Sequence, residues 1–136
     1  MPVHYEWVDD SHFAMNLYLE APWGWEEFDG TAREVYGLLR EHKQPCGVVV
    51  NVSKMGGIPK GNVLAHLQQV ERLIPDNVFV SVLVGAPYAA TVFMNILMKI
   101  RPRAKRMTVF ANTREEAYSV IRRRQQVMER PVTQQR

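Results

Sequence analysis

The sequence predicts a single α/β domain with a mixed, mostly parallel sheet that opens on an antiparallel hairpin. Three observations lead to this fold class. The first residues alternate apolar and polar side chains on both sides of a polar turn, which is typical of a hairpin. Short apolar runs then alternate with segments of helical spacing, as in parallel strands joined by right-handed crossovers. The length of 136 residues fits one domain.

The hairpin is predicted over residues 3–19, where the alternation is broken once, at Asp9-Asp10-Ser11. A helix from about residue 25 to 41 follows, because apolar side chains recur there at helical spacing. Gly30 and Gly37 each weaken this helix by roughly 1 kcal/mol relative to Ala. The valine-rich run 47–52 lacks polar alternation, which predicts a central strand covered on both faces.

The rest of the chain completes the order ββαβαβαβα. Further elements are predicted at residues 63–74 (helix), 78–84 (strand), 88–100 (helix) and 107–110 (strand). Pro102 ends or kinks the helix before it. Thr113 and Glu116 have the spacing of a capping box, so they open a last helix whose inward side chains are Ala117, Val120 and Ile121.

Composition excludes several classes of protein. A hydrophobic fraction of 46% with 23% charged residues is globular, which rules out a disordered chain. The single cysteine, Cys46, excludes an internal disulfide framework and is expected in the core. Neither a secretory signal nor a run of the ~20 apolar residues of a membrane span is visible. We expect a cytoplasmic protein with its domain over residues 1–128 and a frayed basic tail over 129–136.

Charge is distributed unevenly along the chain. Residues 99–136 hold eleven basic and three acidic side chains, a net +8, whereas residues 1–98 hold six basic and eleven acidic ones, a net −5. Such a split can mark a surface for an acidic protein, an anionic lipid or nucleic acid. We favour a solvated last helix instead. Nucleic-acid binding is the weakest functional hypothesis, because the basic segment lacks interleaved aromatic side chains.

Several segments together form a known pattern: the opening hairpin, the strand into Asn51-Val52-Ser53, the strand into Gly85-Ala86-Pro87, and the closing element 109–117. Over roughly residues 3–124 the chain resembles the STAS-like superfamily of sulfate-transporter and anti-sigma-factor-antagonist domains. The similarity is to the divergent, sporulation-antagonist-like bacterial branch. It implies a non-catalytic regulatory domain that binds a protein partner or small ligand.

The resemblance does not extend to the family's phosphorylation switch. That switch uses an Asp-Ser pair at the loop that opens the helix after the central strand. The corresponding place here falls near Pro59-Lys60, and neither residue accepts a phosphoryl group in the usual way. The resemblance therefore implies an interaction domain that lacks the phosphorylatable pair, with the loop 53–62 and the following helix as its contact surface.

The loop 53–62 is also the strongest candidate site on its own residues. Backbone N–H groups at a helix N-terminus, with Lys60 beside them, favour an anion. The candidate contacts for a protein partner or an anion are Ser53, Lys54, Gly56, Gly57, Lys60, Gly61 and Asn62. The spacing is not that of a phosphate-binding P-loop. The other interpretation is a tight connection in which glycines permit positive φ and Asn62 or Gly61 caps the helix.

A second candidate site lies at the end of the next strand, at Gly85, Ala86, Pro87 and Tyr88. Ligands usually bind at the carboxyl ends of parallel strands, so these residues predict a crevice. The alternative function is thus a carrier of a small ligand or lipid, although a turn that binds nothing is equally compatible. Helix 88–100 is apolar on most sides and ends in basic residues. We favour a buried crossover helix, then a homodimer contact, over a membrane surface.

No enzyme is predicted. The four histidines and Cys46 offer one close pair, His42 and Cys46, which does not complete a tetrahedral metal site. Adjacent carboxylates such as Glu26 and Glu27 do not face each other on a helix and make poor acid–base partners. We therefore predict no catalytic residue, no metal and no cofactor. The predicted function is a non-enzymatic regulatory or protein-interaction domain.

Overall fold

Five strands form one mixed sheet in the computed structural model, which describes residues 3–129. The strand order is β1-β2-β3-β4-β5, and only the hairpin of β1 and β2 is antiparallel. The strands are β1 (Val3–Trp7), β2 (Ala14–Glu20), β3 (Cys46–Lys54), β4 (Val78–Val84) and β5 (Thr108–Ala111). This topology confirms the predicted fold class.

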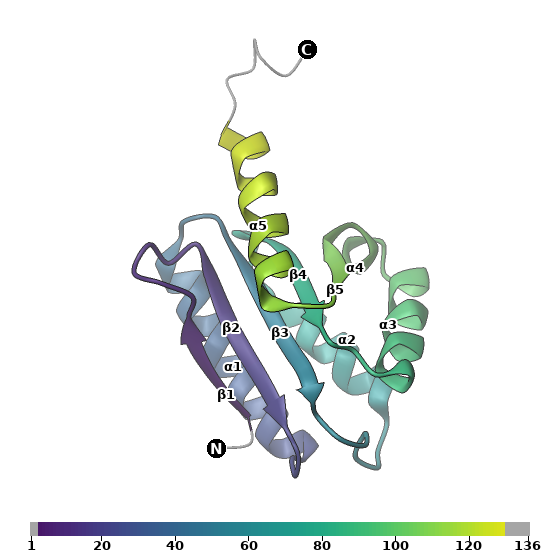
Figure 1. Cartoon of the computed structure of the whole chain (residues 1–136). Helices are drawn as coiled ribbons and strands as arrows, with labels where there is room; N and C mark the ends of the chain where they lie inside the picture. The colour runs from purple at the N-terminus through teal and green to yellow at the C-terminus, as the bar shows by residue number, and fades with distance from the viewer. Residues whose placement is uncertain (1–2, 130–136) are drawn as a thin grey trace.

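Helices cover the sheet unequally on its two faces. They are α1 (Trp25–His42), α2 (Val63–Leu73), α3 (Tyr88–Ile100), α4 (Pro102–Met107) and α5 (Arg114–Glu129). Figure 1 shows α5 on the near face, in front of β3 and β4, with α1 and α2 behind the sheet. Two separate apolar cores result, one between the sheet and α1 to α3, the other between the sheet and α5.

Valines in β3 and β4 divide between these two cores because successive strand side chains point to opposite faces. Val48 packs in the core below α1, and Val49 packs in the core below α5. Gly47 allows the close approach of α5, since a Cβ there would lie 2.9 Å from the Ile121 side chain. The second half of β3 departs from the prediction of cover on both faces. Asn51 and Ser53 lie beyond α5 and are half-buried and exposed, respectively.

The helix α4 was not predicted from the sequence. Pro102 does follow the end of α3, but it also occupies the first turn of a new helix, where its missing N–H costs nothing. The observed order is therefore ββαβαβααβα, and β5 begins one residue later than expected. At α5 the Glu116 N–H donates to Thr113 Oγ1 (3.1 Å), as a capping box requires. Its carboxylate accepts from the N–H of Asn112.

Two further expectations concern single segments. Cys46 is fully buried, and burial raises the pKa of its thiol to about 11, as expected of an inert core residue. The predicted tail 129–136 falls, apart from Glu129 at the end of α5, outside the described residues. Within residues 3–129, no helix combines the length and the apolarity that crossing a bilayer requires.

Candidate functional site

The loop 53–62 is fixed in place by two tryptophans. The Trp23 indole N–H donates to the carbonyl of Met55 (2.8 Å), and that of Trp25 donates to the carbonyl of Pro59 (3.1 Å). The loop lies at the carboxyl edge of the parallel strands, beside the start of α2 (Figure 1). It therefore presents a preorganised surface. These bonds could not be predicted from local sequence patterns, because the partners are more than thirty residues apart.

Three of the seven candidate residues in this loop have clear conformational roles. Gly56 has φ +67° and Gly61 has φ +135°, values that favour glycine. A Cβ on Gly61 would also lie 3.3 Å from the Trp25 ring. Asn62 caps α2, since its Oδ1 accepts from the N–H of Ala65 (3.1 Å). The tight-connection interpretation thus explains these residues. Contact with a partner or an anion stays a prediction, best supported at the exposed lysines of the loop.

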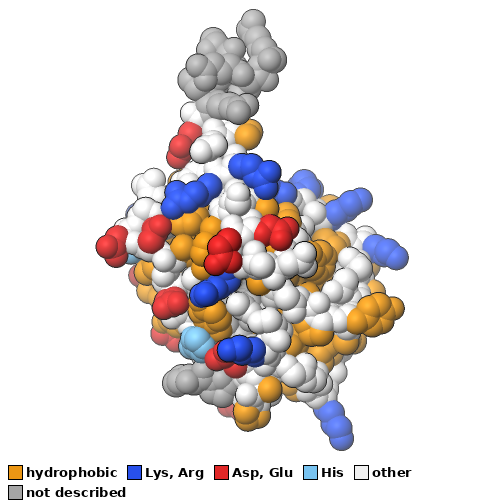
Figure 2. Space-filling view, in the orientation of Figure 1, with side chains coloured by type: hydrophobic (Ala, Val, Ile, Leu, Met, Phe, Trp, Pro, Cys, Tyr) orange, Lys and Arg blue, Asp and Glu red, His pale blue; other side chains and the backbone are white. Residues whose placement is uncertain are grey.

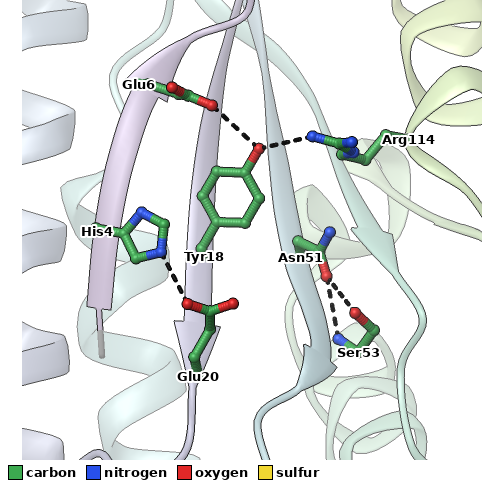
Figure 3. Close-up of polar contacts among 7 residues, drawn as sticks. All are labelled: His4, Glu6, Tyr18, Glu20, Asn51, Ser53 and Arg114. Atoms are coloured by element: carbon green, nitrogen blue, oxygen red, sulfur yellow. Dashed lines mark hydrogen bonds and ion pairs between the residues drawn. The ribbon is translucent and has the colours of Figure 1, made fainter. Parts of the chain in front are cut away.

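The fold brings the two candidate segments together. Gly85 has φ +69°, and a Cβ added there would lie 2.7 Å from Ser53 Cβ. Ser53 itself donates from its N–H and its hydroxyl to Asn51 Oδ1 (3.2 and 2.7 Å; Figure 3). After Gly85, Ala86 contacts the core and Tyr88 is 85% exposed at the start of α3. The crevice expected at 85–88 stays a prediction, and the apolar cavity between the sheet, α2 and α3 is lined by other residues.

That cavity lies between the sheet and the inner faces of α2 and α3, and has a volume of about 140 Å³. Its lining is apolar almost throughout: α3 contributes Ala90, Phe93, Met94 and Leu97, and the sheet contributes Val50 and Leu83. Sequence reasoning missed the cavity, because it depends on how three elements meet.

Four side chains with hydroxyl or carboxyl groups also line this cavity, namely Tyr36, Glu71, Ser81 and Thr108. Ser81 on β4 is 8% exposed, and its hydroxyl has no hydrogen-bond partner within residues 3–129. Burial raises the pKa of Tyr36 to about 12. The nearby Ser81 hydroxyl partly offsets this rise, although the two hydroxyls do not form a hydrogen bond of normal geometry. Glu71 Oε2 accepts from Arg101 Nη2 (2.9 Å) and Nε (3.3 Å), which ties α2 to the end of α3.

The outer face of α3 is an exposed apolar stripe. Its members are spaced four residues apart, namely Tyr88 (85% exposed), Val92 (36%), Ile96 (37%) and Ile100 (50%). In Figure 2, hydrophobic side chains reach the surface on the α3 side of the molecule. Among the residues of α3, all of them described, Leu97 is the one that is fully buried. The expectation of a buried crossover helix is therefore wrong for this face.

A strip of polar side chains covers the half of the near sheet face that α5 leaves open (Figure 3). His4 stacks on Tyr18, with ring centroids 4.7 Å apart, and its Nε2 lies 3.0 Å from Glu20 Oε1. The Tyr18 hydroxyl donates to Glu6 Oε1 (3.3 Å) and accepts from Arg114 Nη1 (3.2 Å). Because these side chains satisfy one another across the strands, the strip is explained by the fold alone.

The histidines do not assemble a metal centre. His12 stacks on Trp7 (4.2 Å) with His42 beside them, and His66 stacks on Trp25 (4.4 Å). His66 Nδ1 also lies 2.9 Å from Asp29 Oδ2. In the part of the chain that the structure describes, no three His, Cys, Asp or Glu side chains gather where they could hold a metal ion.

Comparisons with protein-family models, with curated proteins and with solved structures gave no match to this chain. The resemblance to STAS-like domains therefore stays a prediction, based on element order and short segments. The geometry itself defines a mixed α/β domain with two features that its fold does not require: an apolar stripe on the outer face of α3 and a cavity beneath the inner face of the same helix.

Proposed function

We propose that this chain is a non-enzymatic protein-interaction domain of STAS-like type, lacking the phosphorylatable Asp-Ser pair, and that α3 is its docking surface for a second copy of the chain. The apolar stripe on the outer face of α3 carries the proposal. Contiguous apolar patches on a protein surface usually mark a contact site. A pair of identical stripes related by a two-fold axis is the simplest way to cover one.

The spacing of the stripe suits helix-to-helix packing. Its four side chains recur every four residues from Tyr88 to Ile100, a rise of about 18 Å along the helix. Ridges of this kind interdigitate when two helices cross at about −50°. The stripe would therefore make its closest contacts around its middle members, Val92 and Ile96.

Charge favours an antiparallel pair of α3 helices. Lys99 is the single charged residue in the sequence of α3. An antiparallel arrangement places the two copies of Lys99 at opposite ends of the contact, so they do not repel each other. The opposed helix dipoles also attract.

The stripe is small, so we expect a weak dimer. Four side chains cover less than the ~800 Å² per partner of a standard interface. The dimer should therefore depend on concentration, with a Kd of about 1 μM or weaker. The loop 53–62 lies outside the stripe, and its exposed Lys54 and Lys60 support the separate prediction that it contacts an acidic partner.

Sedimentation equilibrium of the purified chain over a wide concentration range tests the proposal. Ile96→Glu places a charge in the middle of the stripe and should leave a monomer at every concentration. Leu38→Glu is the matched control, because Leu38 on α1 is 38% exposed against 37% for Ile96. It should dimerise like the wild type. A wild-type chain that stays monomeric, or an Ile96→Glu variant that dimerises as strongly as the wild type, overturns the proposal.

A further inference from the structure

The cavity beneath α3 has the size and lining of a site for a small apolar molecule. Protein interiors are normally close-packed, with few voids larger than a water molecule. An apolar cavity of about 150 Å³ in another protein stays dry and takes up benzene. The cavity here, at about 140 Å³ with Phe93, Met94 and Leu97 on one side, has a similar volume and an apolar lining, but it is partly open to the surface. An apolar body of about one six-membered ring fits it.

Ser81 provides a polar anchor in this lining. Ser81 is more than nine-tenths buried and borders the cavity, and its hydroxyl makes no hydrogen bond of normal geometry within the described chain, although the Tyr36 hydroxyl lies nearby. A buried polar group without a partner is costly and is rare in native structures. Since a serine hydroxyl both donates and accepts, a hydroxyl group on a bound molecule would satisfy it.

The remaining polar groups argue against a charged molecule. Glu71 is the acidic side chain of the lining, and Arg101 already neutralises its carboxylate at 2.9 Å. An ion placed among the apolar side chains would lose its hydration without gaining a free counter-charge. The chemistry of the cavity therefore favours a neutral ligand.

We infer that this cavity binds a small neutral cyclic alcohol of the phenol type, with its ring against the inner face of α3 and its hydroxyl paired with Ser81. The site is independent of the proposed self-association, which uses the outer face of the same helix. A monomeric chain that binds such a ligand would contradict the first proposal and support this one.

Phenol and toluene are the probes, because they have the same shape and differ by a hydroxyl against a methyl group. Titration of the ¹⁵N-labelled chain, followed by amide shifts, should show saturable binding of both near α3 and β4. Ser81→Ala should weaken phenol binding by about fivefold, since one hydrogen bond is lost, and leave toluene binding unchanged. No saturable phenol binding, or equal weakening of both probes, overturns the inference.

A pair of neighbouring alanines on α3 provides the control for location. Ala90 lines the cavity, whereas Ala89 is exposed. Ala90→Leu fills the cavity and should abolish binding of both probes, while Ala89→Leu should bind like the wild type. Equal binding by the two variants would place the probes elsewhere and refute the site. Should Ala90→Leu fail to fold in a thermal melt, the Ser81→Ala comparison decides alone.

Discussion

Helices α1 and α3 lie on the same side of the sheet but are attached to it very differently. On α1, five side chains from four successive turns are buried: Phe28, Ala32, Val35, Tyr36 and Leu39. On α3, all of whose residues are described, Leu97 is the one buried side chain. Most of the inner face of α1 packs into the continuous core, and its Phe28 and Tyr36 also reach the cavity, whereas the inner face of α3 borders the cavity along most of its length.

The outer faces differ in the opposite sense. The outward side chains of α1 include Arg33, Glu34 and Arg40, which suit water. Those of α3 are Tyr88, Val92, Ile96 and Ile100. The fold needs one apolar face per crossover helix. The second apolar face of α3 is thus more than the fold requires, and for this reason we assign binding to α3 and stability to α1.

The largest expected effect compares one leucine on each helix. Leu39→Ala should lower the free energy of unfolding by about 4 kcal/mol, because Leu39 is fully enclosed. Leu97→Ala should cost about 2 kcal/mol, since Leu97 faces the cavity on one side and has fewer contacts to lose. Urea unfolding of both variants measures the difference. Equal losses would show that α3 is held as firmly as α1.

The second largest effect concerns Tyr36, a residue of α1 that lines the cavity beneath α3. Burial raises the pKa of Tyr36 from 10.0 to about 12 in the folded chain. The unfolded chain then loses the phenolic proton first, so stability should fall as pH rises from 10 towards 12, by about 1 kcal/mol at pH 11. Tyr36→Phe should lack this component.

Unfolding measurements on the wild type and on Tyr36→Phe, at pH 9 and at pH 11, isolate the contribution of Tyr36. The Cys46 thiol, with its pKa raised to about 11, lowers stability over a similar pH range, but it is present in both proteins and cancels in the comparison. Identical pH dependence of the two proteins would mean that water reaches the Tyr36 hydroxyl through the cavity.

The difference between α1 and α3 also marks the limit of what the sequence predicts. Helix 25–41 has a clear apolar stripe with polar residues opposite, so both its extent and its buried face follow from periodicity. Helix 88–100 was located correctly, but its apolar residues occur on most sides. Periodicity could not tell that Phe93 and Leu97 turn inward while Val92 and Ile96 face the solvent.

In the candidate site, too, some features could be predicted from local sequence and others could not. Local signals predicted positive φ for glycines of the loop 53–62, which Gly56 and Gly61 have, and a cap at Asn62 or Gly61, which Asn62 provides, because both features depend on near neighbours. The bonds from Trp23 and Trp25 to this loop were beyond local reasoning, as was the unpaired hydroxyl of Ser81. The one signal in the sequence was the presence of a polar residue, Ser81, within the otherwise apolar strand VFVSVLV.

The smallest expected effect tests whether packing, rather than helix propensity, holds α1 more firmly than α3. The sequence of α1 contains Gly30 and Gly37, whereas that of α3 contains no glycine. A Cβ added at either glycine meets no atom within 4 Å among the described residues. Gly30→Ala and Gly37→Ala should therefore each raise the free energy of unfolding by about 0.5–1 kcal/mol. Gly47→Ala, whose Cβ would lie 2.9 Å from Ile121, should instead lower it. Should neither α1 variant gain stability in urea unfolding, the helix would already be limited by something other than its glycines.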